Sequence, residues 1–90
     1  MTSDSLETAA QSLTDASDAA SDSEVTERLE SQASQFESMA EADRGPDHGK
    51  LARHEHILHS IADEEGGDVA EHIEDALSAI SSYRETLEGV

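Results

Sequence analysis

The sequence contains no cysteine and no tryptophan, and it has one proline, one phenylalanine and one tyrosine. Without cysteine there is no disulfide framework, no thiolate metal site and no cysteine nucleophile. The chain also lacks a long apolar run, and its start, M-T-S-D-S-L-E, lacks the basic and apolar parts of a signal peptide. We therefore expect no membrane span and no export, and a soluble cytoplasmic protein.

Basic residues are scarce, with five Lys and Arg against 22 Asp and Glu, and a formal net charge of −17. Direct binding to nucleic acid is disfavoured, because contacts to phosphates need a basic surface. An acidic chain of this kind is either disordered or adapted to molar salt, where the Debye length falls to about 3 Å and screens the repulsion between carboxylates. Regular apolar spacing argues against disorder, so the composition favours a halophilic, archaeal protein.

Apolar residues recur at helical intervals in four segments, which predicts an all-α fold. Short connections between the segments favour an antiparallel up-down-up-down four-helix bundle in one domain. We expect a helical hairpin at 4–43, a Gly-Pro hinge at 44–47 and a second helical hairpin at 47–88. Residues 21–23 hold neither Gly nor Pro. A three-helix fold with the first two segments fused into one long helix is therefore the alternative.

The predicted helix ends depend on a few residues with known capping preferences. Ser21, Asp47 and Asp68 are the expected N-caps of the second, third and fourth helices. Gly45 suits a left-handed position after the second helix, and Pro46 cannot continue that helix. The predicted apolar faces hold the following residues: Leu6, Ala9, Ala10, Leu13, Ala16, Ala20, Val25, Leu29, Gln32, Ala33, Phe36, Met39, Ala40, Leu51, Leu58, Ile61, Ala62, Val69, Ile73, Ala76, Leu77, Ile80, Tyr83 and Leu87.

A cluster of cations at the start of the third helix suggests a site for a small anion. Helix starts favour acidic side chains, yet here Arg44, His48, Lys50 and Arg53 surround the first turn. Together with free backbone amides these side chains could bind phosphate or a carboxylate. The other interpretation is that they offset an acidic end of the bundle, which includes Glu88.

The third helix also carries most of the histidines. His54 falls on the apolar side of the helix and is expected in the core. His56, His59 and Asp63 lie on another flank at spacings of three and four residues, at which side chains can share a metal ion. His72 lies at the edge of the fourth helix and could add a ligand. These four residues form the metal-site hypothesis for a divalent ion.

Two resemblances accompany these patterns. The segment L-A-R-H-E-H-I-L-H-S-I at 51–61 resembles the opening His-Glu helix of hemerythrin-type cation-binding bundles, but the chain lacks the His and Glu positions that those proteins carry on their other helices. The run R-G-P-D-H-G-K-L-A-R-H and the ending S-Y-R-E-T-L-E-G-V resemble a family of short uncharacterised haloarchaeal proteins. That resemblance implies a small halophilic helical protein and no particular activity.

Catalysis has no support in the sequence, because no serine has a recognisable His-plus-acid setting and 22 carboxylates produce neighbouring pairs by chance. The preferred interpretation is a non-enzymatic interaction or scaffold module without a cofactor, which forms a homodimer or binds an unidentified protein. Few large apolar side chains suggest the homodimer, with a face of the segment 4–43 buried against a second copy. The alternative is a protein that binds a metal ion or a small anion through the His-rich third helix.

Overall fold

The computed structural model describes residues 4–87, and these residues form four α-helices. The helices are α1 (Asp4–Ala19), α2 (Ser23–Glu41), α3 (His48–Glu65) and α4 (Gly67–Arg84). No strand occurs within residues 4–87. The prediction of an all-α four-helix bundle is confirmed, and the fused alternative is wrong because α1 and α2 are separate helices.

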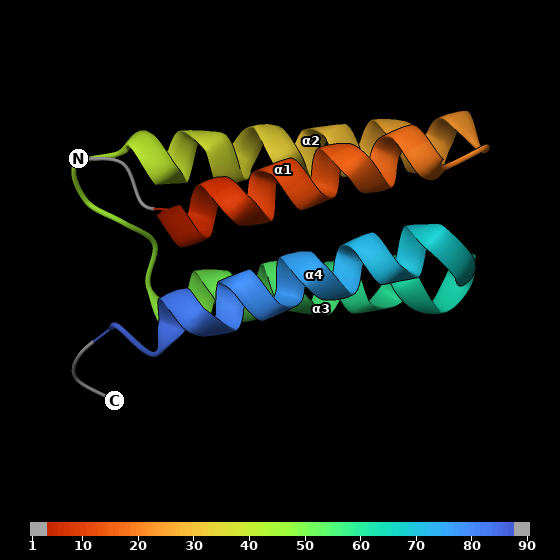
Figure 1. Ribbon diagram of the computed structural model, residues 1–90. Coiled ribbons are helices and arrows are strands. Elements are labelled where there is room, and N and C mark those ends of the chain that lie inside the picture. Colours follow the sequence, from red (N-terminus) through yellow and green to blue (C-terminus); the bar gives the residue numbers. More distant parts are fainter. Residues whose placement is uncertain (1–3, 88–90) are drawn as a thin grey trace.

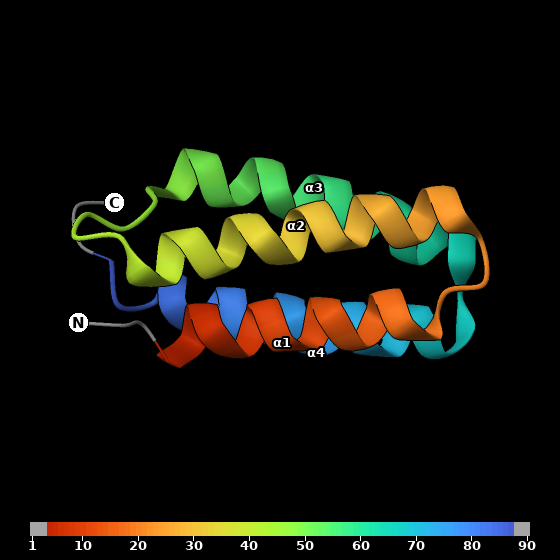
Figure 2. The same cartoon turned by 90° about the horizontal axis from the view of Figure 1, so that it is seen from above.

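Consecutive helices run in opposite directions, and α1 and α2 form a pair beside the pair of α3 and α4 (Figure 1). The connection between α2 and α3 lies at the same end as the start of α1 and the end of α4 (Figure 2). Helix α1 packs closely on both α2 and α4, and α3 packs on α4. The second predicted hairpin, 47–88, extends by its last residue beyond the described part of the chain.

The close packing of α1 follows from its small side chains. Ala9, Ala10 and Ala16 are almost completely buried. Leu6 and Leu13, the two large apolar residues of α1, have no exposed surface. Small residues let helix axes approach, so a helix with two large apolar residues can still be covered on two sides. The buried apolar residues are Leu6, Ala9, Ala10, Leu13, Ala16, Val25, Leu29, Ala33, Phe36, Met39, Ala40, Leu51, Leu58, Ile61, Val69, Ile73, Ala76 and Ile80. The predicted apolar faces therefore correspond to the observed core.

The helix starts agree with the predictions at one position and differ at two. The carboxylate of Asp47 accepts from the backbone N–H of Lys50 at 2.8 Å, which confirms it as the N-cap of α3. For α2 the N-cap is Asp22 and not Ser21, because Asp22 accepts from two backbone N–H groups of the first turn. For α4 the cap position is Gly66, and Asp68 lies in the first turn, where its charge still suits the helix dipole.

Gly45 has a different role from the predicted left-handed turn, because the glycines with positive φ among the described residues are Gly66 and Gly67. A Cβ atom on Gly45 would lie inside van der Waals contact with the hydroxyl of Tyr83 and 3.3 Å from its Cζ. The ring at the end of α4 therefore packs directly against the backbone between α2 and α3. This contact holds the connection against the second helical pair.

Gly45→Ala should destabilise the chain by about 0.5–1.5 kcal/mol, because the new methyl group forces the half-buried Tyr83 side chain out of its present rotamer. Combining it with Tyr83→Phe should recover part of that loss, since the clashing hydroxyl is removed. Chemical denaturation in molar KCl measures both effects. Gly49→Ala is the matched control, because its nearest neighbour would be 3.6 Å away and the substitution should be neutral or stabilising. An unchanged stability for Gly45→Ala would contradict the proposed contact.

Candidate functional site

Helices α2 and α3 meet through a buried polar contact. Nδ1 of His54 lies 2.6 Å from Oε1 of Gln32, and both side chains are buried, at 6% and 7% exposure. The ring of Phe36 meets the imidazole edge-on at a centroid distance of 5.1 Å. Because the partner atom is a carbonyl oxygen, Nδ1 carries the proton and donates it. The expectation that His54 belongs to the core is confirmed.

The surroundings of His54 favour its neutral form. Burial lowers the pKa of His54 below its ordinary value of 6.5, and the positive charges of Lys50 and Arg53 lower this pKa further. From α2, the neutral side chains of Gln32 and Phe36 face the ring. His54 is therefore a neutral structural donor in the folded chain.

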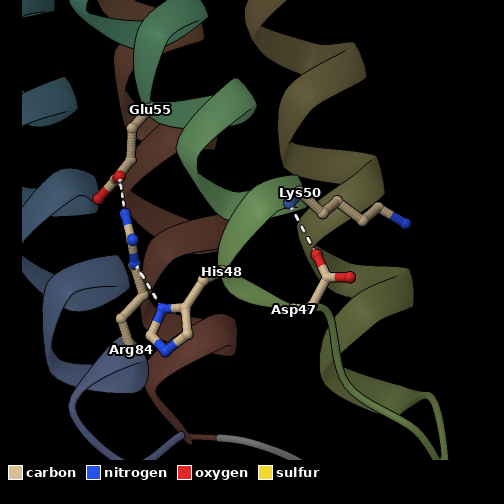
Figure 3. A network of polar contacts seen from close by, with 5 residues as sticks. All are labelled: Asp47, His48, Lys50, Glu55 and Arg84. Atoms are coloured by element: carbon tan, nitrogen blue, oxygen red, sulfur yellow. Dashed lines mark hydrogen bonds and ion pairs between the residues drawn. The ribbon is translucent and has the colours of Figure 1, made fainter. Parts of the chain in front are cut away.

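A second polar cluster joins the start of α3 to the end of α4 (Figure 3). Arg84 donates from Nε to Nδ1 of His48 at 3.0 Å, and its Nη1 forms a 2.5 Å ion pair with Oε1 of Glu55. Since Nδ1 of His48 accepts, the ring N–H of this histidine is at Nε2. That nitrogen is buried and has no hydrogen-bond partner within the described residues. The ion pair is only partly exposed. Because Arg84 contacts both His48 and Glu55, it connects two groups of α3 to α4.

The structure divides the four residues of the predicted anion site. Arg44 and Lys50 line one groove between α2 and α3, whereas His48 turns towards α4 and binds Arg84. Figure 3 shows Lys50 and His48 extending to opposite sides of α3. Arg53 is exposed and is not part of the groove wall. The groove therefore offers two cations to a ligand, together with the carboxylate of Asp47.

The residues of the metal-site hypothesis do not form a cluster of ligands either. Within residues 4–87, no group of three or more His, Asp or Glu side chains is arranged to hold a metal ion. His56, His59 and Asp63 are exposed on α3. His72 lies about 120° around α4 from Arg84, the residue of that helix that binds α3. The metal site stays a prediction that this arrangement does not support.

Grooves follow the seam between α2 and α3 from one end to the other. Near the hinge, a groove of about 480 Å³ is lined by Ser34, Gln35, Ser38, Met39, Ala42, Arg44, Gly45, Pro46, Asp47 and Lys50. The middle holds one of about 520 Å³, lined by Glu24, Glu27, Arg28, Ser31, Gln32 and Ile57. The far end holds one of about 380 Å³, lined by Asp22, Glu24, Val25, Arg28, Glu64 and Glu65. We call this surface the α2–α3 seam.

Sequence reasoning missed two residues of these clusters. Gln32 falls on the predicted apolar stripe by its position, and no local pattern predicts a contact for Arg84. Arg84 is a basic residue in the last turn of α4, which is a weak signal because such residues commonly just complement the helix dipole. Its partners lie on α3, 29 and 36 residues away in sequence, beyond any local pattern.

The fold and these clusters define a small all-α bundle whose polar residues join its helices. A family model described as a family of unknown function, DUF7553, matches residues 1–86, and the chain belongs to this family. The chain matches no curated protein and no solved structure. Within the described residues, no helix is long and apolar enough to cross a membrane. The predicted resemblance to a family without an assigned activity is confirmed, and haloarchaeal origin stays a prediction.

The buried histidine predicts a specific dependence of stability on pH. Because the folded chain keeps His54 neutral to a lower pH than the unfolded chain does, unfolding takes up a proton below about pH 6.5. The stability from this group is present above pH 6.5 and is lost as the pH falls through the folded-state pKa. Denaturant unfolding between pH 7 and 5, above the range where most carboxylates titrate, measures the slope.

His54→Gln should flatten this slope, because glutamine keeps a donor for Gln32 and does not titrate in this range. The matched control is His59→Gln, which removes an exposed histidine from the same helix and should leave the slope unchanged. Equal slopes for the wild type and His54→Gln would contradict the assignment.

Proposed function

We propose that this chain is a non-enzymatic interaction module of a high-salt archaeal cytoplasm and that it acts by self-association. The observation that carries the proposal is the open α2–α3 seam. Within residues 4–87, α1 packs closely on α2 and α4, and α3 packs on α4, whereas α2 and α3 approach each other less closely and have grooves along their length. Such a seam can accept helices from another molecule.

The use of the polar residues supports a role without catalysis. His54 is engaged by Gln32, and His48 and Glu55 are both engaged by Arg84. These side chains hold helices in register, which is a structural task. A general base or nucleophile would instead point into a pocket and reach a substrate.

The face that the sequence suggested for the dimer is not the one that we propose now. The large apolar side chains of the segment 4–43, which include Leu13, Leu29 and Phe36, are fully buried within the chain itself. They pack in the core of the bundle and leave little apolar surface on α1 for a second copy. The seam has a half-buried apolar residue, Ile57, in one of its grooves.

In molar KCl the chain should be a dimer at tens of micromolar. High salt matters, because each copy carries a net charge of −17 and repels the other at low ionic strength. Multi-angle light scattering on a size-exclusion column gives the mass directly, against 9.6 kDa for one chain. A single species of monomer mass across this concentration range would remove the proposal of self-association.

The second candidate is binding of a small anion, and the hinge-end groove favours it. Arg44 and Lys50 line this groove together with the hydroxyl-bearing Ser34 and Ser38. Cations and hydroxyl groups are suitable donors to a phosphate or a carboxylate. The Asp47 carboxylate in the same wall opposes an anion, although it is engaged by the α3 backbone.

If the anion candidate is correct, isothermal titration with inorganic phosphate in molar KCl should show saturable heat. The double variant Arg44→Gln and Lys50→Gln should abolish that heat. Arg28→Gln is the control, because Arg28 lies at the opposite part of the seam and pairs with Glu64. Equal heats for the wild type and the double variant would exclude binding in this groove.

A further inference from the structure

The charges of the α2–α3 seam are distributed unevenly along its length. At the hinge end, Arg44 and Lys50 line the groove and Arg53 lies one turn further along α3. At the other end, the walls contain Asp22, Glu24, Glu27, Glu64 and Glu65, with Arg28 paired to Glu64. The hinge-end groove therefore has two lining cations against the one carboxylate of Asp47, whereas the other end has five carboxylates against the one cation Arg28. The two ends differ in the sign of their charge, in a chain with 22 acidic and five basic residues.

One stretch of α2 along the seam carries no charged lining residue. On the α3-facing side of α2, the groove walls between Arg28 and Arg44 contain only the uncharged Ser31, Gln32, Ser34, Gln35, Ser38, Met39 and Ala42. On α3, Ile57 lines the middle groove, which also contains Arg28, and it is half-buried against the core. Ile57 lies seven residues from Lys50 and seven from Glu64, so the three residues share one face of α3 and Ile57 marks its midpoint.

This distribution fits a second copy of the same chain in one orientation. We propose that two copies pair through their α2–α3 seams around a two-fold axis that passes near Ile57 and runs across the helices. The α3 helices then lie antiparallel, with Lys50 of each copy opposite Glu64 of the other and Ile57 opposite Ile57. A two-fold axis along the helices would place cations on cations and carboxylates on carboxylates, which electrostatic complementarity disfavours.

The size of the seam is consistent with a weak and reversible dimer. Helices of 18 and 19 residues span about 27 Å, and two of them side by side are roughly 20 Å wide. The resulting face is of the order of 500 Å² per copy, at the lower end of specific interfaces. Molar salt suits such an interface, because a Debye length of about 3 Å removes the net repulsion and retains contacts between facing charges. The inference rests on the proposed self-association and specifies its surface.

Ile57→Cys tests the position of the axis, because the chain has no other cysteine. At an axis the introduced thiol meets its own copy, so oxidation or a short thiol crosslinker in molar KCl should convert most of the chain into a covalent dimer. Asp75→Cys provides the control, since Asp75 is exposed on α4 and should crosslink only slowly. Equal crosslinking of the two variants would overturn the proposed axis.

An exchange of charges tests the orientation without touching the core. Lys50→Glu with Arg53→Glu makes the charges that α3 contributes acidic at both ends of the seam, and Glu64→Lys with Glu65→Lys makes them basic at both ends. Each double variant alone should dimerise about tenfold more weakly or worse, whereas an equimolar mixture should form a heterodimer as tight as the wild type. Loss of the exposed Arg28–Glu64 pair should hardly affect folding, and circular dichroism checks this.

The control for net charge mixes the first double variant with Glu71→Lys and Asp75→Lys, a pair of exposed residues on α4. This mixture has the same total charge and should not recover the dimer. Light scattering distinguishes a failure of the proposed self-association from a failure of the proposed interface. A wild-type monomer removes both the proposed function and the interface. A wild-type dimer that tolerates every seam variant, or a mixture that fails to recover, overturns the interface alone.

Discussion

The hydrogen bond between His54 and Gln32 is the constraint on which the relation between α2 and α3 depends. Both groups are buried, and a buried donor or acceptor without its partner costs about 1–3 kcal/mol. The two helices must therefore keep the register and the separation that join Nδ1 to Oε1. An apolar pair of similar size would tolerate sliding and closer approach, whereas this pair fixes α2 and α3 at a distance that leaves grooves above it.

The remaining contacts of the bundle leave the distance between α2 and α3 unchanged. On the opposite side, the alanines of α1 allow close packing against both α2 and α4, so the core is closed there by small side chains. At the hinge end, Arg84 joins α4 to α3, and Tyr83 packs against the backbone of Gly45. The contacts of Arg84 and Tyr83 link the second helical pair to itself and to the connection, and the contacts of α1 lie on the other side of the core, so none of them narrows the seam between α2 and α3.

The helices and the core could be predicted from the sequence, because they depend on local periodicity. Contacts between residues that are distant in the sequence could not be predicted. Apolar residues such as Leu58 and Ile73 show their burial through the 3.6-residue repeat, so the four helices and the core position of His54 were predictable. Asp47 was recognisable as a cap because Gly45 and Pro46 precede it. For α2, Ser21 and Asp22 are both good N-caps, and propensity does not choose between neighbours. The roles of Gly45 and Arg84 depend on contacts with residues more than 25 positions away, which no local pattern contains.

The arrangement of the candidate sites could not be predicted from local sequence patterns either. The order of charged residues along the seam gives information that these patterns lack. Four cations near one helix start looked like one site, yet they divide because successive residues point to different sides of α3. Serine by itself does not mark the seam, since Ser78 and Ser82 are exposed on α4 as well. The informative feature is the order of charges along the seam. Acidic residues of α2 such as Glu30 and Glu37 are exposed but do not line the seam grooves. A surface that only needed hydration would have no reason to gather Arg44 and Lys50 at one end of the seam and most of its carboxylates at the other. A surface that meets its own copy in the antiparallel orientation needs this difference between its ends, because each end then faces the opposite end of the other copy.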